Sequence, residues 1–148
     1  PLLAQITAFT VAHSVTLALT IYQVVSLPSR FVEPAIALSI AYVGIENAAT
    51  RTVKPWRIAL VFAFGLLHGM GFAGVLRDLG IPRSELGTAL VAFNAGVELG
   101  QLAVVGLAFL LVASWARKKQ CYRPRVVIPV LILIALIGLY WTIQRSAA

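Results

Sequence analysis

Five long apolar runs, separated by brief connections, constrain the fold of this 148-residue chain more than any other feature of its sequence. A helix that crosses a bilayer needs about 20 mostly apolar residues, and each run is close to that length. We therefore predict an all-α, polytopic transmembrane helix bundle that forms one domain over residues 1–148. The five predicted spans cover about residues 4–25, 32–49, 57–76, 86–112 and 126–143.

The scarcity of charge excludes the soluble classes of protein. Only 11% of the residues are charged and 60% are apolar, whereas a soluble domain carries about 25% charged residues. A soluble enzyme and a disordered tail are therefore excluded, and the predicted environment is the lipid bilayer. The net charge of +7 comes from basic residues between the apolar runs, so we expect no nucleic-acid partner. A single cysteine, Cys121, allows no intrachain disulfide and no Cys-based zinc site.

The basic residues also predict the orientation of the chain. Lys and Arg are enriched in cytoplasmic loops, and most of them lie in or next to the connections Arg51–Pro55 and Ala113–Pro124. These two connections are therefore predicted to be cytoplasmic, and the C-terminus to lie outside. The predicted inner side holds Arg51, Lys54, Arg57, Arg117, Lys118, Lys119, Arg123 and Arg125, and the outer side holds Arg30, Arg77, Arg83 and Arg145.

Ionisable residues inside the runs are the strongest functional signal, because a charge at the bilayer centre costs about 3 kcal/mol or more. His13, His68 and Glu98 fall near the centres of three different runs, at a similar predicted depth. Further polar residues at helical spacing must face the bundle interior or a watery cavity rather than lipid. The polar stripes are Thr10, His13, Thr16, Thr20 and Gln23 in the first run, Ser39, Glu46 and Asn47 in the second, and Asn94, Glu98 and Gln101 in the fourth, while Glu33 begins the second run.

Small residues beside these polar positions predict close helix packing. The last run, 126–143, holds no charged residue and is predicted to be lipid-facing support. A weak similarity between residues 8–13 and 63–68 is most simply a chance similarity between two apolar helices. The small residues are Gly65, Gly69, Gly71 and Gly74 around His68, and Gly96 and Gly100 around Glu98.

Two imidazoles and a carboxylate at one depth favour a divalent metal site, because such ligands suit nickel, cobalt, zinc and iron. A proton relay is an alternative, since histidine titrates near neutral pH and a buried glutamate can be tuned upward. Structural roles are alternatives as well. They are a helix-to-helix hydrogen bond for His13, a structural pair of His68 with Glu98, a first-turn carboxylate at Glu33, and an ion pair of Glu46 with Arg51 or Lys54.

Four motifs resemble the HupE/UreJ family of membrane proteins. Phe9–Leu19 is similar to the family's FTxAHSxTLxL helix, and Val32–Ile40, followed by Glu46 and Asn47, resembles its next segment. Phe64–Ala73 resembles its glycine-rich histidine segment, and Phe93–Gln101 its FNxGVExGQ helix. The resemblance covers about residues 5–105 in order. It implies a bacterial inner-membrane protein that accompanies hydrogenase or urease systems, as a nickel or cobalt permease or a metal-delivery accessory.

The resemblance also implies a set of site residues. Family members usually carry an earlier helix with a His-rich HxxxGxDH-like motif, which this sequence lacks, so we expect the full protein to have a preceding helix. The implied candidates for metal ligands are His13, Glu33, Glu46, Asn47, His68, Asn94 and Glu98.

The hypothesis from the sequence is a bundle, without enzymatic activity, that binds and passes nickel or cobalt as its substrate. His13 and His68 would be neutral nitrogen ligands, and Glu98, joined by Glu33, would supply carboxylate oxygens. Asn94 and Asn47 would be weaker or outer ligands. Such mixed ligation is weak enough to release the ion.

Two other classes of function stay open. The first is an intramembrane zinc-dependent hydrolase, which would need a general base and a lateral substrate path that no motif here supplies. The second is a non-transporting assembly partner within a metalloenzyme maturation system. It predicts that substitutions of the residues at mid-membrane depth are tolerated.

Overall fold

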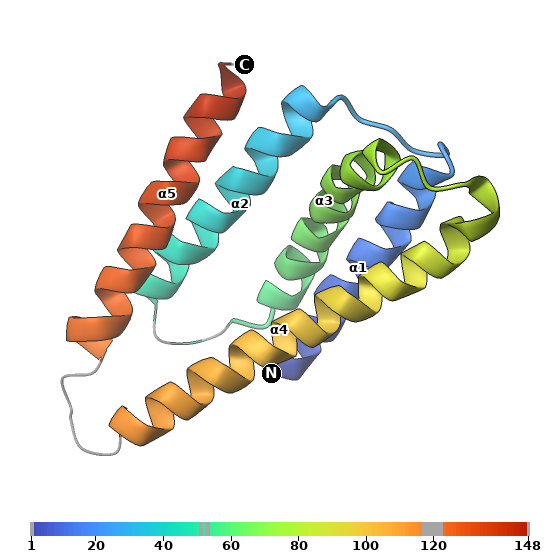
Figure 1. Cartoon of the computed structure of the whole chain (residues 1–148). Helices are drawn as coiled ribbons and strands as arrows, with labels where there is room; N and C mark the ends of the chain where they lie inside the picture. The colour runs from blue at the N-terminus through green and yellow to red at the C-terminus, as the bar shows by residue number, and fades with distance from the viewer. Residues whose placement is uncertain (1, 51, 53, 117–122, 148) are drawn as a thin grey trace.

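The computed structural model describes residues 2–50, 52, 54–116 and 123–147, and the regular structure in these ranges is entirely helical. The predicted all-α bundle is therefore confirmed (Figure 1). A 3₁₀ turn (Arg83–Glu85) leads into the fourth long helix, and a π-helical turn (Arg123–Val127) leads into the fifth. The long helices are α1 (Leu2–Ile21), α2 (Ser29–Ala49), α3 (Arg57–Asp78), α4 (Leu86–Ala116) and α5 (Ile128–Ser146).

Some of the basic residues used for the predicted orientation, and the single cysteine, cannot be placed in this fold. They lie outside the described residues, so the orientation stays a prediction. These residues are Arg51, Arg117, Lys118, Lys119 and Cys121.

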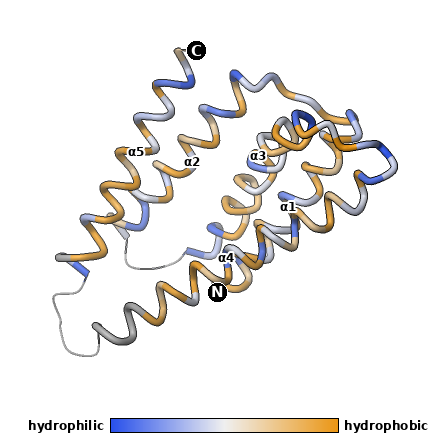
Figure 2. The backbone as a smooth tube through the Cα atoms, viewed as in Figure 1, coloured by the Kyte–Doolittle hydropathy of each residue, from blue (hydrophilic) through white to orange (hydrophobic). Residues whose placement is uncertain are grey.

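Among the described helices, four are long and apolar enough to cross a membrane: α1, α3, α5 and the segment Arg83–Leu110, which holds most of α4. α2 has 21 residues but carries Arg30, Glu33 and Glu46, and it falls outside that group. Hydrophobic residues dominate the helices, while many hydrophilic residues lie at helix ends and connections (Figure 2). The chain is thus a multi-pass membrane protein with four or five spans.

α1 ends at Ile21 rather than near Val25, because the backbone turns away there. Gln23 adopts a left-handed conformation with a φ of 61°. The amide groups of Gln23 and Val24 donate hydrogen bonds to the carbonyls of Thr20 (3.1 Å) and Leu19 (2.9 Å). This Schellman arrangement satisfies the last carbonyls of the helix. The prediction that placed Gln23 on the polar stripe of α1 was therefore wrong.

α1 and α3 run parallel, with their backbones in contact at two glycines. A Cβ at Gly65 would lie 2.6 Å from the carbonyl oxygen of Phe9. A Cβ at Gly69 would collide with the carbonyl oxygen of His13 and with Oγ1 of Thr16. Because only hydrogen fits at these positions, the glycines of α3 allow the close approach that their spacing predicted. The similar segments 8–13 and 63–68 thus lie in neighbouring parallel helices.

α2 and α5 form a second close pair, which runs antiparallel. A Cβ at Gly44 would lie 3.1 Å from the carbonyl oxygen of Leu131, and a Cβ at Gly138 would lie 2.8 Å from the amide nitrogen of Ala41. The opposite face of α5 is open, and Ile143, for example, is 71% exposed. α5 therefore supports α2 with one face and leaves the other free for lipid.

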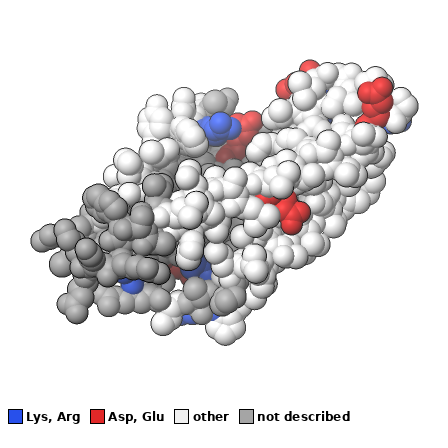
Figure 3. All heavy atoms as spheres, turned by 60° about the horizontal axis from the view of Figure 1, so that its bottom comes forward, with Lys and Arg blue, Asp and Glu red and all other residues white. Residues whose placement is uncertain are grey.

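α4 leans across α1 and is the most loosely packed long helix (Figure 1). Its first turns join the main apolar cluster, where Leu90 packs with Leu17 and Leu76. Further along, Leu99 and Val104 are 67% and 68% exposed. Most of the described surface visible in Figure 3 is uncharged, and the few charged side chains cover a small part of it. Such a surface suits lipid and not water.

Candidate functional site

The first histidine lies in an aromatic enclosure between α1, α3 and α4. His13 is only 1% exposed. Its ring stacks on Phe9 of the same helix, with centroids 5.9 Å apart, and on Phe93 of α4, at 6.2 Å. Phe72 of α3 meets it edge-on at 5.6 Å. The enclosure excludes water and fixes the plane of the imidazole.

Neither ring nitrogen of His13 has a hydrogen-bond partner among the described residues, although both are buried. An unpaired polar atom in a dry interior costs about 1 to 3 kcal/mol. Buried polar groups left in this state often mark a site that a ligand, an ion or water completes. His13 therefore has the character of a functional group rather than of a helix-to-helix hydrogen bond, which was the structural alternative.

The second histidine contacts the same phenylalanine. The ring of His68 meets Phe9 edge-on at a centroid distance of 5.3 Å, so one Phe9 ring contacts both imidazoles. Nδ1 of His68 lies 2.8 Å from the carbonyl oxygen of Phe64. Because a carbonyl oxygen only accepts, Nδ1 carries the proton and Nε2 of the neutral ring keeps its lone pair.

His68 is also the more accessible histidine. It lines a cavity of about 390 Å³ between α1, α2, α3 and α5. Asn47 and Ser39 of α2 line the same cavity, which is otherwise mostly apolar. The structure thus brings His68 and Asn47, two of the predicted site residues, to one space. His13 is reached only through the aromatic enclosure.

The carboxylates do not join the histidines. Glu98 is exposed on α4. Glu33 pairs with Arg145 of α5. Glu46 lies 3.9 Å from Nε of Arg57, with both side chains nearly buried. In the part of the chain that the structure describes, no three His, Cys, Asp or Glu residues come close enough to hold a metal together.

Ion pairing explains two of these positions and corrects two structural alternatives. Glu46 pairs with Arg57 rather than with Lys54, because the connection returns α3 alongside the end of α2. Glu33 is not a first-turn carboxylate, because α2 begins at Ser29 and its first turn holds no acidic residue. The antiparallel packing of α5 on α2 brings Arg145 to it instead. The basic residues at the helix ends were visible in the sequence, but their partners depend on how the helices pair.

Asn94 lies on α4 and directly follows Phe93 in the chain. Its Nδ2 donates to the carbonyl of Leu90 at 2.9 Å. Its Oδ1 is buried and accepts no hydrogen bond from the described residues. An amide oxygen in this state is a possible ligand or a partner for bound water.

Phe9 is the residue that sequence reasoning missed. It was read as part of a motif and not as a site residue, yet its ring contacts both imidazoles. The available signal was its position four residues before His13, which places the two side chains on one face of a helix. The contact with His68 depends on the packing of α3 and had no signal in the sequence.

The arrangement offers two imidazoles in an aromatic setting, with Asn47 of α2 lining the same cavity as His68. Imidazole nitrogen and amide oxygen suit borderline divalent metals such as nickel, cobalt and zinc. A site with a small number of ligands and a low total charge binds an ion weakly enough to release it.

Comparison with protein families matches residues 1–145 to the family described as "HupE / UreJ protein". No curated protein and no solved structure matches the chain. The match covers nearly the whole chain, including both histidine-bearing helices.

Proposed function

Because this chain belongs to the HupE/UreJ family, we propose that it binds a divalent transition metal, nickel or cobalt, within the bilayer and passes it across to supply a metalloenzyme. The proposed place of action is the inner membrane of a bacterium, with the ends of α2 and α4 on the cytoplasmic side. The metal is cargo, and we propose no enzymatic step.

The observation that carries this proposal is the pair of histidines that both contact Phe9. His13 holds two buried nitrogens without partners, and His68 holds Nε2 free while Phe64 fixes its tautomer. A hydrogen bond on the far nitrogen of an imidazole orients the ring and raises its basicity as a metal ligand. His68 is therefore set up as the ligand that first meets an ion in the adjoining cavity, and His13 as the second ligand.

Oxygen ligands complete the proposed site from the neighbouring helices. Asn94 of α4 offers a buried Oδ1 without a partner among the described residues, and Asn47 lines the His68 cavity. Glu98 lies one helical turn from Asn94 on α4, and a turn of this loosely packed helix would bring its carboxylate towards the pair. Glu33 and Glu46, which hold ion pairs, serve at the two ends of the route.

Metal binding by the purified full chain, with variants that keep the ring volume, tests this proposal. We expect wild-type protein in detergent to retain nickel or cobalt by elemental analysis. The variants His13→Phe and His68→Phe should each bind at least about tenfold more weakly, since each loses one inner-shell ligand. Uptake into proteoliposomes should fall in parallel.

Thr142→Val on α5 is the matched control, because its hydroxyl bonds only within its own helix. Melting curves establish that the histidine variants remain folded. Equal metal content in wild type and in the double histidine variant would refute the proposal. Binding without uptake would instead favour a non-transporting accessory.

A further inference from the structure

A polar cavity lies at the end of the bundle where α1 and α3 finish and α2 begins. It has a volume of about 310 Å³ and is named the end cavity below. In the predicted orientation this end faces the outside. The end cavity lies about two helical turns beyond His13 along α1, with Thr20 in its wall. It is the place where an ion would enter before it meets the histidines.

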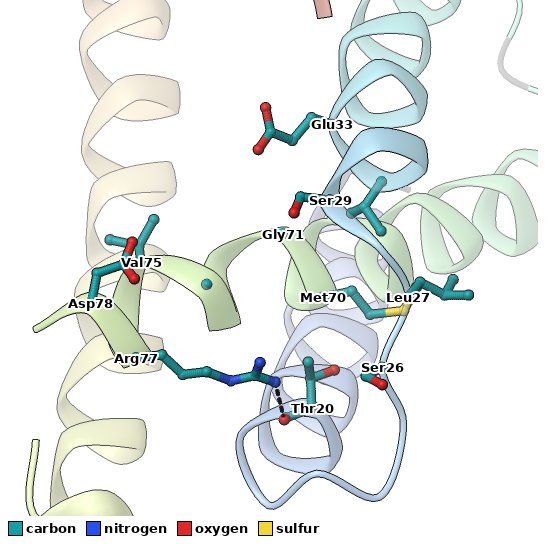
Figure 4. Close-up of a pocket in the computed structure, with 12 residues that line it drawn as sticks. Thr20, Ser26, Leu27, Ser29, Glu33, Met70, Gly71, Val75, Arg77 and Asp78 are labelled. Atoms are coloured by element: carbon teal, nitrogen blue, oxygen red, sulfur yellow. Dashed lines mark hydrogen bonds between the residues drawn. The ribbon is translucent and has the colours of Figure 1, made fainter. Parts of the chain in front are cut away.

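Two carboxylates from different helices line the end cavity. Glu33 comes from α2, and Asp78 is the last residue of α3. Figure 4 shows them on different sides of the space, Glu33 on α2 and Asp78 at the end of α3. Asp78 is exposed, and the Glu33 side chain is 44% exposed. Oxygen atoms of this kind accept hydrogen bonds from the water shell of a hard or borderline cation.

An independent observation points to a ligand in the same space. Thr20 lines the end cavity, is 5% exposed, and has a buried Oγ1 without a partner among the described residues. Hydroxyls buried in membrane helices commonly bond the carbonyl one turn earlier, as Thr16 does with Ala12 at 3.0 Å. Thr20 departs from that pattern, because its buried hydroxyl bonds no described residue although the residue lines the end cavity.

The guanidinium group of Arg77 lines the end cavity as a positive charge. Nη2 of Arg77 donates to the carbonyl oxygen of Thr20 at 2.8 Å, which holds the guanidinium at the α1 side of the end cavity (Figure 4). Arg145 pairs with Glu33 from α5. These two cations reduce the attraction of the carboxylates for another cation. A site of this kind captures an ion weakly, as a conducting pathway requires.

The volume of the end cavity indicates whether an ion in it keeps its water shell. The end cavity, at about 310 Å³, is many times the space that a single bound water requires, so it can hold a cluster of waters. A divalent ion with about six waters fits, whereas a bare ion would leave most of the space empty. We infer that the end cavity captures a hydrated divalent cation, with Glu33, Asp78 and Thr20 binding its water shell and Arg77 limiting its affinity. The inference rests on the proposed function, because the ion is the same cargo.

The concentration dependence of cobalt uptake into proteoliposomes is the first test. Asp78→Asn should raise the half-saturating cobalt concentration about threefold to tenfold, with the maximal rate nearly unchanged. Arg77→Gln should lower that concentration, because a repelling charge is removed. A merely structural role for these residues would not give effects of opposite sign. Glu85→Gln is the matched control, since Glu85 is exposed in the neighbouring 3₁₀ turn and does not line the cavity.

Equilibrium dialysis of cobalt with the His13→Phe/His68→Phe variant provides a readout that does not need uptake. Weak residual binding should persist there and disappear when Asp78→Asn and Glu33→Gln are added. Tight binding at the histidines should persist in the Asp78→Asn protein, which separates failure at the end cavity from failure of the proposed function. The inference is overturned if neither carboxylate variant changes cobalt binding, or if Arg77→Gln leaves the affinity for cobalt unchanged.

Discussion

Helices α3 and α4 are built from the same kinds of residue, with glycines around His68 in α3 and around Glu98 in α4. In α3, Gly65 and Gly69 touch the backbone of α1, and the histidine beside them reaches the site. In α4, Gly96 and Gly100 have nothing within 4 Å of an added Cβ, and Glu98 is exposed.

The difference shows what a small-residue pattern can and cannot predict. Glycines make a close approach possible, but the partner helix decides whether it takes place. α1 offers α3 carbonyls and small side chains at matching intervals. α4 meets α1 mainly through its first turns and one side-chain hydrogen bond, from Thr10 to Gln101 at 3.5 Å.

The contrast between α3 and α4 is tested most strongly by removing one carboxylate at each helix: Glu46, which pairs with Arg57 of α3, and Glu98 of α4. Glu46→Gln leaves the nearly buried Arg57 of α3 without a counter-charge, so the free energy of unfolding should fall by about 3 kcal/mol or more. Glu98→Gln removes an exposed carboxylate from α4 and should cost nothing measurable. Denaturant titrations in detergent measure both. Equal losses would mean that Glu98 has a buried partner in the folded protein.

The next largest effect on stability should come from adding one methyl group at a glycine of α3, compared with the same change at a glycine of α4. Gly69→Ala forces the backbones of α1 and α3 apart and should cost about 2 to 3 kcal/mol. Gly100→Ala meets open space and should stay within about 1 kcal/mol of wild type. Melting temperatures of the two variants, measured side by side, are sufficient. A destabilised Gly100→Ala protein would indicate that a helix packs there.

The smallest expected effect concerns the contact that ties α4 to α1. Thr10→Val keeps the side-chain shape but removes the hydroxyl that donates to Gln101. Hydrogen bonds between membrane helices contribute about 0.6 kcal/mol on average, and we expect a loss of that size. Thr142→Val serves again as the control. A loss as large as that of Gly69→Ala would contradict the loose attachment of α4.

Most of the fold could be predicted because length and apolarity alone identify membrane helices. The predicted end of α2 at Ala49 and start of α3 at Arg57 agree with the structure. The end of α1 was missed, because Gln23 takes the left-handed position where glycine is the usual signal.

The depth of the candidate site residues along their helices could be predicted, but the direction in which each side chain points around its helix axis could not. Counting residues along each run placed His13, His68 and Glu98 at one level, and the structure brings both histidines to Phe9. The same count gives no information on which way Glu98 points around α4. The partners of Glu33 and Glu46 depend on helix pairing across as many as 112 residues, which a single sequence does not reveal.

The parallel course of α1 and α3 has an electrostatic consequence at the end cavity. Peptide dipoles sum along each helix and leave about half a negative charge at its C-terminus. At this end of the bundle the C-terminal ends of α1 and α3, at Ile21 and Asp78, meet the N-terminal ends of α2, at Ser29, and of α4, at Leu86. The negative ends of the two parallel helices therefore lie beside positive ends of two others, so the backbone dipoles largely offset one another here and leave the charged side chains to set the potential of the end cavity.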